Sequence, residues 1–337
     1  MLTERREAIL RVIVADYITG AMPVASKAIA YNYDLRVSPA TVRNDVAYLE
    51  EEGYIMHPHP SAGAIPTDKA YRYYVEMISR DVELPLAEQY WIYELFQGVK
   101  EEFEQCLKLA AALLAHFVRN VAVVTPVKAP RCRFKHLDLV ALQDFVVLLV
   151  LVLYQARVRQ KTLFFNKRLS QDDLTMMANK LNSAYAGMAG SEIPVEGEEL
   201  SPEERRVTEC IVDMITAEDR LGYGKPYLEG LYLMLSQPEF ANNPKALNLL
   251  ELLEGEDWVE AMFQPRLATG EIKVVIGGEN PDEALQDLSL ILSEYGVPDK
   301  AGGIIGVIGP KRMDYARAIS SVNCLSSLLS KSVARYI

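Results

Sequence analysis

The sequence predicts an α+β protein of several domains, and three observations support this fold class. The chain has 337 residues, which is more than one hydrophobic core usually serves, so two or three domains are expected. Residues 1–80 combine helical spacing of apolar residues with cap and turn signals. Residues 121–165 contain successive β-branched apolar runs with short connections, which indicates antiparallel strands, and helical patterns return after residue 170.

Two helices are expected in the first 33 residues. The first follows Thr3, a suitable N-cap, because two glutamates come in its first turn and apolar residues then recur on one face. The glycine and proline of "TGAMP" end it. A second short helix spans about residues 25–33.

A third helix begins at a strong signal, Ser38 as N-cap followed by Pro39 at the first helical position. Apolar residues at i, i+4 and i+7 predict its buried stripe: Val42, Val46 and Leu49. The opposite face is small, polar and positive in its N-terminal half: Ala40, Arg43, Asn44 and Ala47. The acidic run 50–52 comes at the far end, where it slightly opposes the helix dipole. A helix whose N-terminal half approaches phosphates would carry its charges in this order.

A hairpin follows the third helix. Gly53 is a plausible C-cap, "YIM" and "AIPT" read as short strands, and Pro66 restricts the second to a sheet edge. Three helices and a hairpin make a winged helix-turn-helix, whose third helix would enter the major groove of DNA. The candidate DNA-binding residues are Lys27, Arg36, Ser38, Thr41, Arg43, Asn44, His57 and His59. The alternative is a helical head that touches only protein, since residues 1–80 hold nine Lys or Arg against ten Asp or Glu.

Composition excludes several other classes. The net charge is −11, so any nucleic-acid site must be a local feature of the surface. The longest apolar run, at 145–154, is too short for a membrane helix and reads as a buried strand, and a soluble cytoplasmic protein is expected. No catalytic or metal-ligand spacing stands out, and His57 and His59 lack neighbouring ligands. The glycine-rich "GGIIGVIGP" lacks phosphate-loop spacing and reads as a strand, so no enzyme activity, cofactor or metal is expected.

Three stretches resemble the HrcA family of heat-inducible transcription repressors. They are "SPATVRNDVAYLEEEGYIMHPHPSAGAIPTDKAYRYYVE", "KVVIGGEN" and "GGIIGVIGPKRMDYARAISSVNCLSSLLSKSV". The start of the chain and its overall length also fit, and the resemblance is weakest between about 170 and 265.

The resemblance implies three domains and a function. The domains would be a DNA-binding winged helix at 1–80, a GAF-like domain at 81–167 and 266–337, and a mainly helical inserted dimerisation domain at 168–265. The strand run 136–165 could instead belong to the insert. The implied function is repression of chaperone genes by a dimer bound to an inverted-repeat operator on double-stranded DNA, relieved on heat stress. The implied partner is a GroEL-type chaperonin, and the alternative is a GAF-type small-molecule sensor whose helical head docks protein.

The sequence also departs from the family pattern. Ala64, Pro60 and Ala70 stand where the family usually has Arg, Thr and Gly, and the run "LVLVLYQARV" is more apolar than usual. Because an arginine at position 64 would suit a phosphate, the wing is expected to be the weak part of this DNA reader.

Overall fold

The computed structural model shows two compact units. They are Met1–Val127 together with Tyr223–Ile337, and Lys128–Gly222. The residues described are 2–32, 38–59, 62–78, 82–99, 102–128, 132–154, 158–195, 200–220, 225–240, 253, 269–298 and 300–336. Within these residues no helix is both long and apolar enough to cross a membrane.

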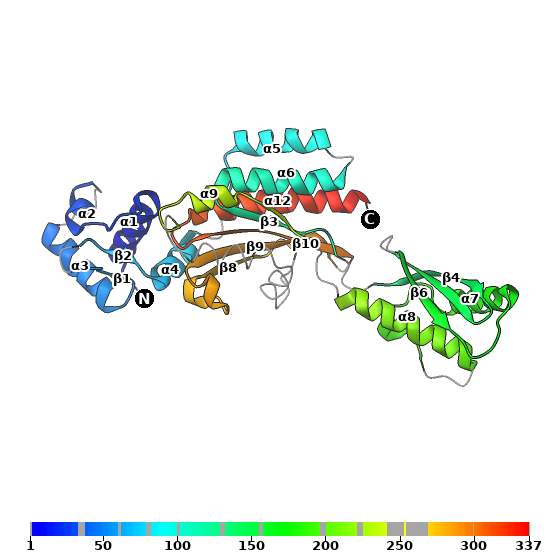
Figure 1. Ribbon diagram of the computed structural model, residues 1–337. Helices are drawn as coiled ribbons and strands as arrows, with labels where there is room; N and C mark the ends of the chain where they lie inside the picture. Colours follow the sequence, from blue (N-terminus) through cyan, green and yellow to red (C-terminus); the bar gives the residue numbers. More distant parts are fainter. Residues whose placement is uncertain are drawn as a thin grey trace. The chain divides into compact units, whose positions relative to one another are not determined.

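The first unit begins with a small helical head. Its elements are α1 (Glu4–Gly20), α2 (Ser26–Asn32), α3 (Pro39–Glu51), β1 (Ile55–Met56), β2 (Ile65–Pro66) and α4 (Asp68–Ile78). Figure 1 shows α1, α2 and α3 gathered around the β1–β2 hairpin. The strands are antiparallel, with Ile55 opposite Pro66. The predicted helices and hairpin are therefore present, with boundaries within one or two residues.

A five-stranded antiparallel sheet forms the rest of the first unit, in the order β7-β3-β10-β9-β8. The strands are β3 (Val121–Val124), β7 (Tyr227–Glu229), β8 (Ile272–Ile276), β9 (Leu288–Val297) and β10 (Ala301–Pro310). One face packs on α6 (Phe103–Val118) and α12 (Tyr315–Tyr336), which run along the sheet in Figure 1. The other face forms a second core with α9 (Leu231–Leu235). Burial on both faces explains the unbroken apolar run of β10.

The second unit has its own sheet and core. Its main elements are β4 (Phe134–Gln143), β5 (Val146–Leu153), β6 (Val158–Phe164), α7 (Gln171–Tyr185) and α8 (Pro202–Arg220). Alternate residues of β5 are buried against the two helices, from Val147 to Leu153. Ser170 begins α7 with a capping box, in which its Oγ accepts a hydrogen bond from the Asp173 amide at 3.2 Å.

The structure differs from the sequence-based expectations in three places. The broad apolar face of residues 89–118 predicts one helix, whereas the structure has two, α5 (Leu86–Val99) and α6, which pack on each other. Strand β9 was not foreseen, because its residues are buried on both faces and show no alternation. The insert expected at 168–265 differs from the compact unit Lys128–Gly222, because the β4–β6 sheet packs on α7 instead of joining the five-stranded sheet. Most of the expected helical stretch after residue 240 lies outside the described residues.

Candidate nucleic-acid interface

Helix α3 starts at the surface with its first turn open to solvent. Ser38 has an extended backbone, and its Oγ accepts a hydrogen bond from the Thr41 amide at 3.2 Å. The same Oγ lies 2.9 Å from the Thr41 hydroxyl, and Pro39 occupies the first helical position. The predicted cap is therefore present. Pro39 has no amide hydrogen, the Thr41 amide donates to the cap, and the Val42 amide donates to the Ser38 carbonyl at 3.1 Å, so the Ala40 amide is the donor that this turn leaves for an anion.

The two faces of α3 divide as the periodicity predicts. Val42, Val46 and Leu49 are buried in the core of the head. The exposed residues in the N-terminal half of the same helix include Ala40, Arg43, Asn44 and Ala47, and Glu50 and Glu51 are exposed at its end. Arg43 offers a bidentate donor and Asn44 a paired donor and acceptor, and these groups suit guanine and adenine edges in a major groove.

Lys27 extends this surface and Arg36 cannot be placed on it. Lys27 is exposed on α2, which packs against α3. Arg36 lies outside the described residues. An exposed lysine beside a reading helix is suited to a backbone phosphate, where it adds affinity without sequence preference.

A buried carboxylate locks α3 onto α1. Asp45 is 2% exposed and accepts hydrogen bonds from Arg5 Nε at 2.6 Å, Arg5 Nη2 at 3.1 Å and Arg6 Nε at 3.2 Å. The Arg5 hydrogen bond, opposed in part by burial, holds the pKa of Asp45 below its usual range. The Arg6 guanidinium also lies over the Tyr48 ring, 3.4 Å from its centre. Two arginines of α1 are therefore committed to orienting α3.

Sequence reasoning missed Asp45, although a signal was present. The residue sits three positions after Val42, inside the buried stripe of α3, where an unpaired charge is costly. The two adjacent arginines in the first helix supply the missing partner. A charge within an apolar stripe, opposite a basic pair on another helix, is a signature of such a lock.

The two histidines of the hairpin segment, His57 and His59, have different surroundings. His57 Nδ1 lies 2.8 Å from Glu50 Oε1 at the end of α3, so a carboxylate stands beside it. His59 is exposed. Ala64 is 1% exposed, and its amide and carbonyl pair with Val24 at 2.8 and 2.9 Å. Its methyl group thus faces the core of the head instead of solvent.

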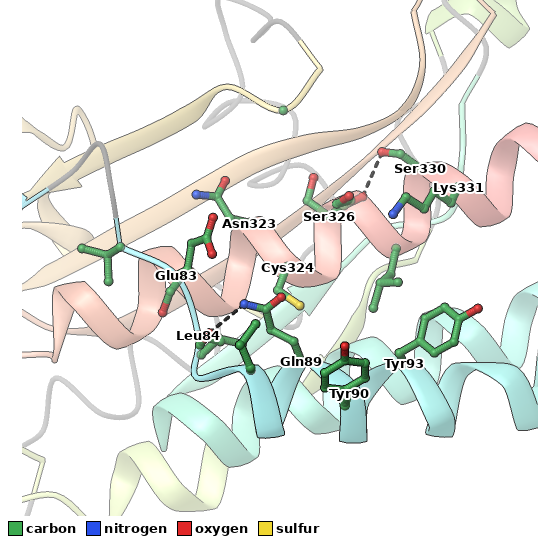
Figure 2. A pocket seen from close by; sticks show the side chains of 16 residues that line it. Glu83, Leu84, Gln89, Tyr90, Tyr93, Asn323, Cys324, Ser326, Ser330 and Lys331 are labelled. Atoms are coloured by element: carbon green, nitrogen blue, oxygen red, sulfur yellow. Dashed lines mark hydrogen bonds between the residues drawn. The ribbon is translucent and has the colours of Figure 1, made fainter.

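A cavity in the first unit is the candidate binding site that the alternative function, a small-molecule sensor, would require. It has a volume of 1130 Å³ and lies between α5 and α12, as Figure 2 shows. Gln89 Nε2 donates to the Leu84 carbonyl at 2.7 Å on one wall, and Ser330 Oγ donates to the Ser326 carbonyl at 2.8 Å on the other. Burial raises the pKa of the Cys324 thiol in the same wall. In the described part of the chain, no group of three potential metal ligands occurs here or elsewhere.

Comparison with known proteins assigns the family. The model of the HrcA protein C-terminal domain matches residues 104–319. The heat-inducible transcription repressor HrcA of Dehalococcoides mccartyi is 44% identical over 334 residues, covering 99% of this chain and 96% of the relative. The repressor of the same name from Roseiflexus castenholzii is 37% identical over 346 residues, covering 99% and 95%.

A solved structure supports the fold alone. A hypothetical protein known from a crystal structure aligns with a TM-score of 0.60 at 22% identity, covering 100% of this chain and 99% of its own. The evolutionary relationship therefore rests on the full-length sequence matches, and these agree with the motifs at both ends of the chain. The chain belongs to the HrcA family of heat-inducible transcription repressors, and its function is negative regulation of heat-shock transcription.

Proposed function

We propose that the head is a winged helix-turn-helix that reads operator DNA with α3 in the major groove and the β1–β2 hairpin beside the backbone. The observation that carries this proposal is the exposed face of α3, with Arg43 and Asn44 opposite a fully buried stripe. The Asp45 lock supports it, because a reading helix must be held in one orientation for base contacts to form.

Each polar residue of the head then has a distinct role. Arg43 and Asn44 read base edges, whereas Lys27 and the Ala40 amide in the first turn of α3 hold phosphates. Thr41 belongs to that turn, and the Ser38 hydroxyl acts mainly through its cap, since it is already engaged. Among the hairpin residues His59 is the better placed for DNA, because Glu50 competes for His57.

Operator binding requires a homodimer, because an inverted repeat is matched by a protein with two-fold symmetry. The β4–β6 sheet offers a surface for this contact. On its face away from α7 the central strand is apolar, and the apolar members of that face are Val140, Val146, Leu148, Val150, Val152, Val158 and Phe164. The polar residues His136, Asp138, Gln160 and Thr162 lie on the same face, on the two outer strands. Phe164 is 62% exposed and Val158 is 56% exposed, which is unusual for a sheet face in a monomer. We therefore assign dimerisation to the unit Lys128–Gly222.

The remaining parts fit the same scheme. The five-stranded sheet with α6 and α12 is the proposed GAF-like body. Because a transcription repressor acts on the chromosome, we propose that the protein works in the cytoplasm. The operator is an inverted repeat upstream of chaperone genes, and a GroEL-type chaperonin is the partner that heat diverts. An apolar sheet face awaiting its second copy is the kind of surface that chaperonins recognise.

Operator binding tests the reading helix. Arg43→Ala should abolish specific binding to a fluorescent inverted-repeat duplex, since one bidentate base contact contributes about 1–3 kcal/mol per half-site. Arg168→Ala is the matched control, because Arg168 is an exposed arginine in the other unit, with its side chain 76% exposed. Wild-type affinity for Arg43→Ala would show that another face reads DNA. Failure of the wild-type protein to bind would favour the small-molecule sensor.

The oligomeric state tests the dimer surface. Val150→Glu places a charge in the apolar row of the central strand β5, opposite Asp138, and should shift sedimentation from dimer to monomer. Met176→Glu is the control, because Met176 is 66% exposed on α7, away from that face. A dimeric Val150→Glu protein would move the contact elsewhere.

A further inference from the structure

Helix α4 carries two sets of contacts on opposite sides. Toward the head, the Tyr73 hydroxyl donates to Glu7 on α1, and the Tyr73 ring meets the Tyr54 ring edge-on at 5.6 Å. Toward the sheet it presents Asp68, Tyr71 and Arg72, spaced about one helical turn apart. The same helix therefore belongs to the DNA-reading head and to the body that follows it.

The sheet-facing side is held by charged groups. Arg72 Nη2 donates to the Val274 carbonyl at 2.8 Å, and Arg72 Nε donates to Glu279 Oε1 at 2.8 Å. Asp68 Oδ1 pairs with Lys311 Nζ at 2.8 Å, and Asp68 Oδ2 accepts from the Gly278 amide at 2.9 Å. Two residues of one helix thus bind strand β8, the turn after it, and the segment before α12.

A third charged residue reaches across to α1. Arg312, three residues before α12 begins at Tyr315, donates through Nη1 to the Ile18 carbonyl at 3.1 Å. Its Nη2 lies 3.1 Å from Glu239 Oε2, so the guanidinium is held on both sides. The last turn of α1 is therefore tied to the body independently of α4.

Close packing alone does not set this junction. The Tyr71 and Tyr315 rings meet at 5.8 Å, but a cavity of 730 Å³ opens beside them. The hairpin lines one side of the cavity, and Leu288, Lys311 and Arg312 line the other. Because space remains for the head to tilt, the polar contacts determine its angle.

We propose that Asp68, Arg72 and Arg312 are positioning residues that fix the direction of α3 against the body, and so the half-site spacing that the dimer accepts. None of them lies on the exposed face of α3. They hold the α3 helices of the two copies at one separation, so the dimer loses less conformational entropy when it binds DNA. This inference rests on the proposed operator binding.

The test compares operators of different spacing. The probe is the inverted-repeat duplex from the promoter of the chaperone genes, with zero or about five added base pairs, roughly half a helical turn, between the half-sites. The wild-type protein should bind the native spacing and lose most of its affinity for the lengthened one. In Arg72→Ala/Arg312→Ala, the ratio of these two affinities should fall about tenfold, while affinity for a single half-site stays unchanged. Arg11→Ala is the control, since Arg11 contacts only Met77 within the head among its described polar partners.

Three results separate the possibilities. An unchanged spacing ratio in the folded double variant overturns the inference, even if every protein binds DNA. If the double variant does not fold, Glu279→Gln provides the measurement, because it removes the negative charge that pairs with Arg72 and leaves the Val274 contact. An equal ratio for that variant also overturns it, and an intermediate ratio supports it. Absence of any operator binding by the wild-type protein refutes the proposed function itself.

Discussion

Replacing Asp45 with asparagine should loosen α3 without changing the exposed face that we propose to contact DNA. The substitution keeps the size of the side chain and removes the charge that Arg5 and Arg6 share. Asparagine also presents one amide group where a carboxylate now accepts three hydrogen bonds. The helix should therefore open more often from its place on α1.

The size of the effect follows from burial. Exposed ion pairs contribute up to about 1 kcal/mol, whereas removing one partner of a fully buried pair costs about 3–5 kcal/mol. Asp45 is buried, but the Arg5 and Arg6 side chains are 47% and 26% exposed and can regain water. We expect about 2 kcal/mol for Asp45→Asn, which lies between these limits.

Hydrogen exchange of the α3 amides, followed by mass spectrometry on the whole protein, measures this locally. A loss of about 2 kcal/mol corresponds to about a 30-fold fall in protection. Glu51→Gln is the control, because Glu51 is exposed on the same helix. Operator affinity should fall as well, although residue 45 lies on the buried side.

The pH dependence provides a second check. The folded-state pKa of Asp45 lies below its ordinary value of 3.8, so its stabilisation is complete above that value and is lost as pH falls through the folded pKa. The difference between wild type and Asp45→Asn should be constant near neutral pH and shrink in acid. Equal protection of the two proteins at neutral pH would refute the reasoning.

Two further substitutions probe other contacts. Gly277 has φ +52°, and a Cβ there would lie 2.2 Å from Asp68 Oδ2, so Gly277→Ala should destabilise the protein by about 1–3 kcal/mol in thermal unfolding. Gly278→Ala is its control, because the nearest atom to a Cβ there is 3.7 Å away, and equal effects would contradict the assigned strain. Glu50→Gln should tighten DNA binding, because it removes a negative charge from the end of α3 and a carboxylate that competes for His57. Fluorescence anisotropy with Glu51→Gln as control measures this, and the idea fails if both variants bind alike.

Local signals predicted helix α3 well. The Ser38 cap, the Pro39 start and the Val42–Val46–Leu49 stripe depend on neighbours within the same helix, and the structure confirms all of them. The strands β4, β5 and β6 were also anticipated, because β-branched runs and short connections are local features.

Long-range contacts escaped prediction. Asp45 meets Arg5 across 40 residues of sequence, and Arg72 meets Glu279 across 207. No periodicity links such positions, so the lock on α3 and the junction with the body appear only in three dimensions. The position of Ala64 escaped for the same reason, since its burial depends on pairing with Val24.

The chain leaves the first unit after β3 and re-enters it before β7, and these two strands are direct neighbours, with Val124 opposite Tyr227. Paired residues on adjacent antiparallel strands lie only about 5 Å apart, so the chain leaves and re-enters the first unit at nearly the same place. A stretch with such closely spaced ends can be lengthened, exchanged or replaced without changing the strand order around it. The segment Lys128–Gly222, which we propose as the dimerisation unit, can therefore change in evolution while the helical head and the five-stranded sheet keep their fold.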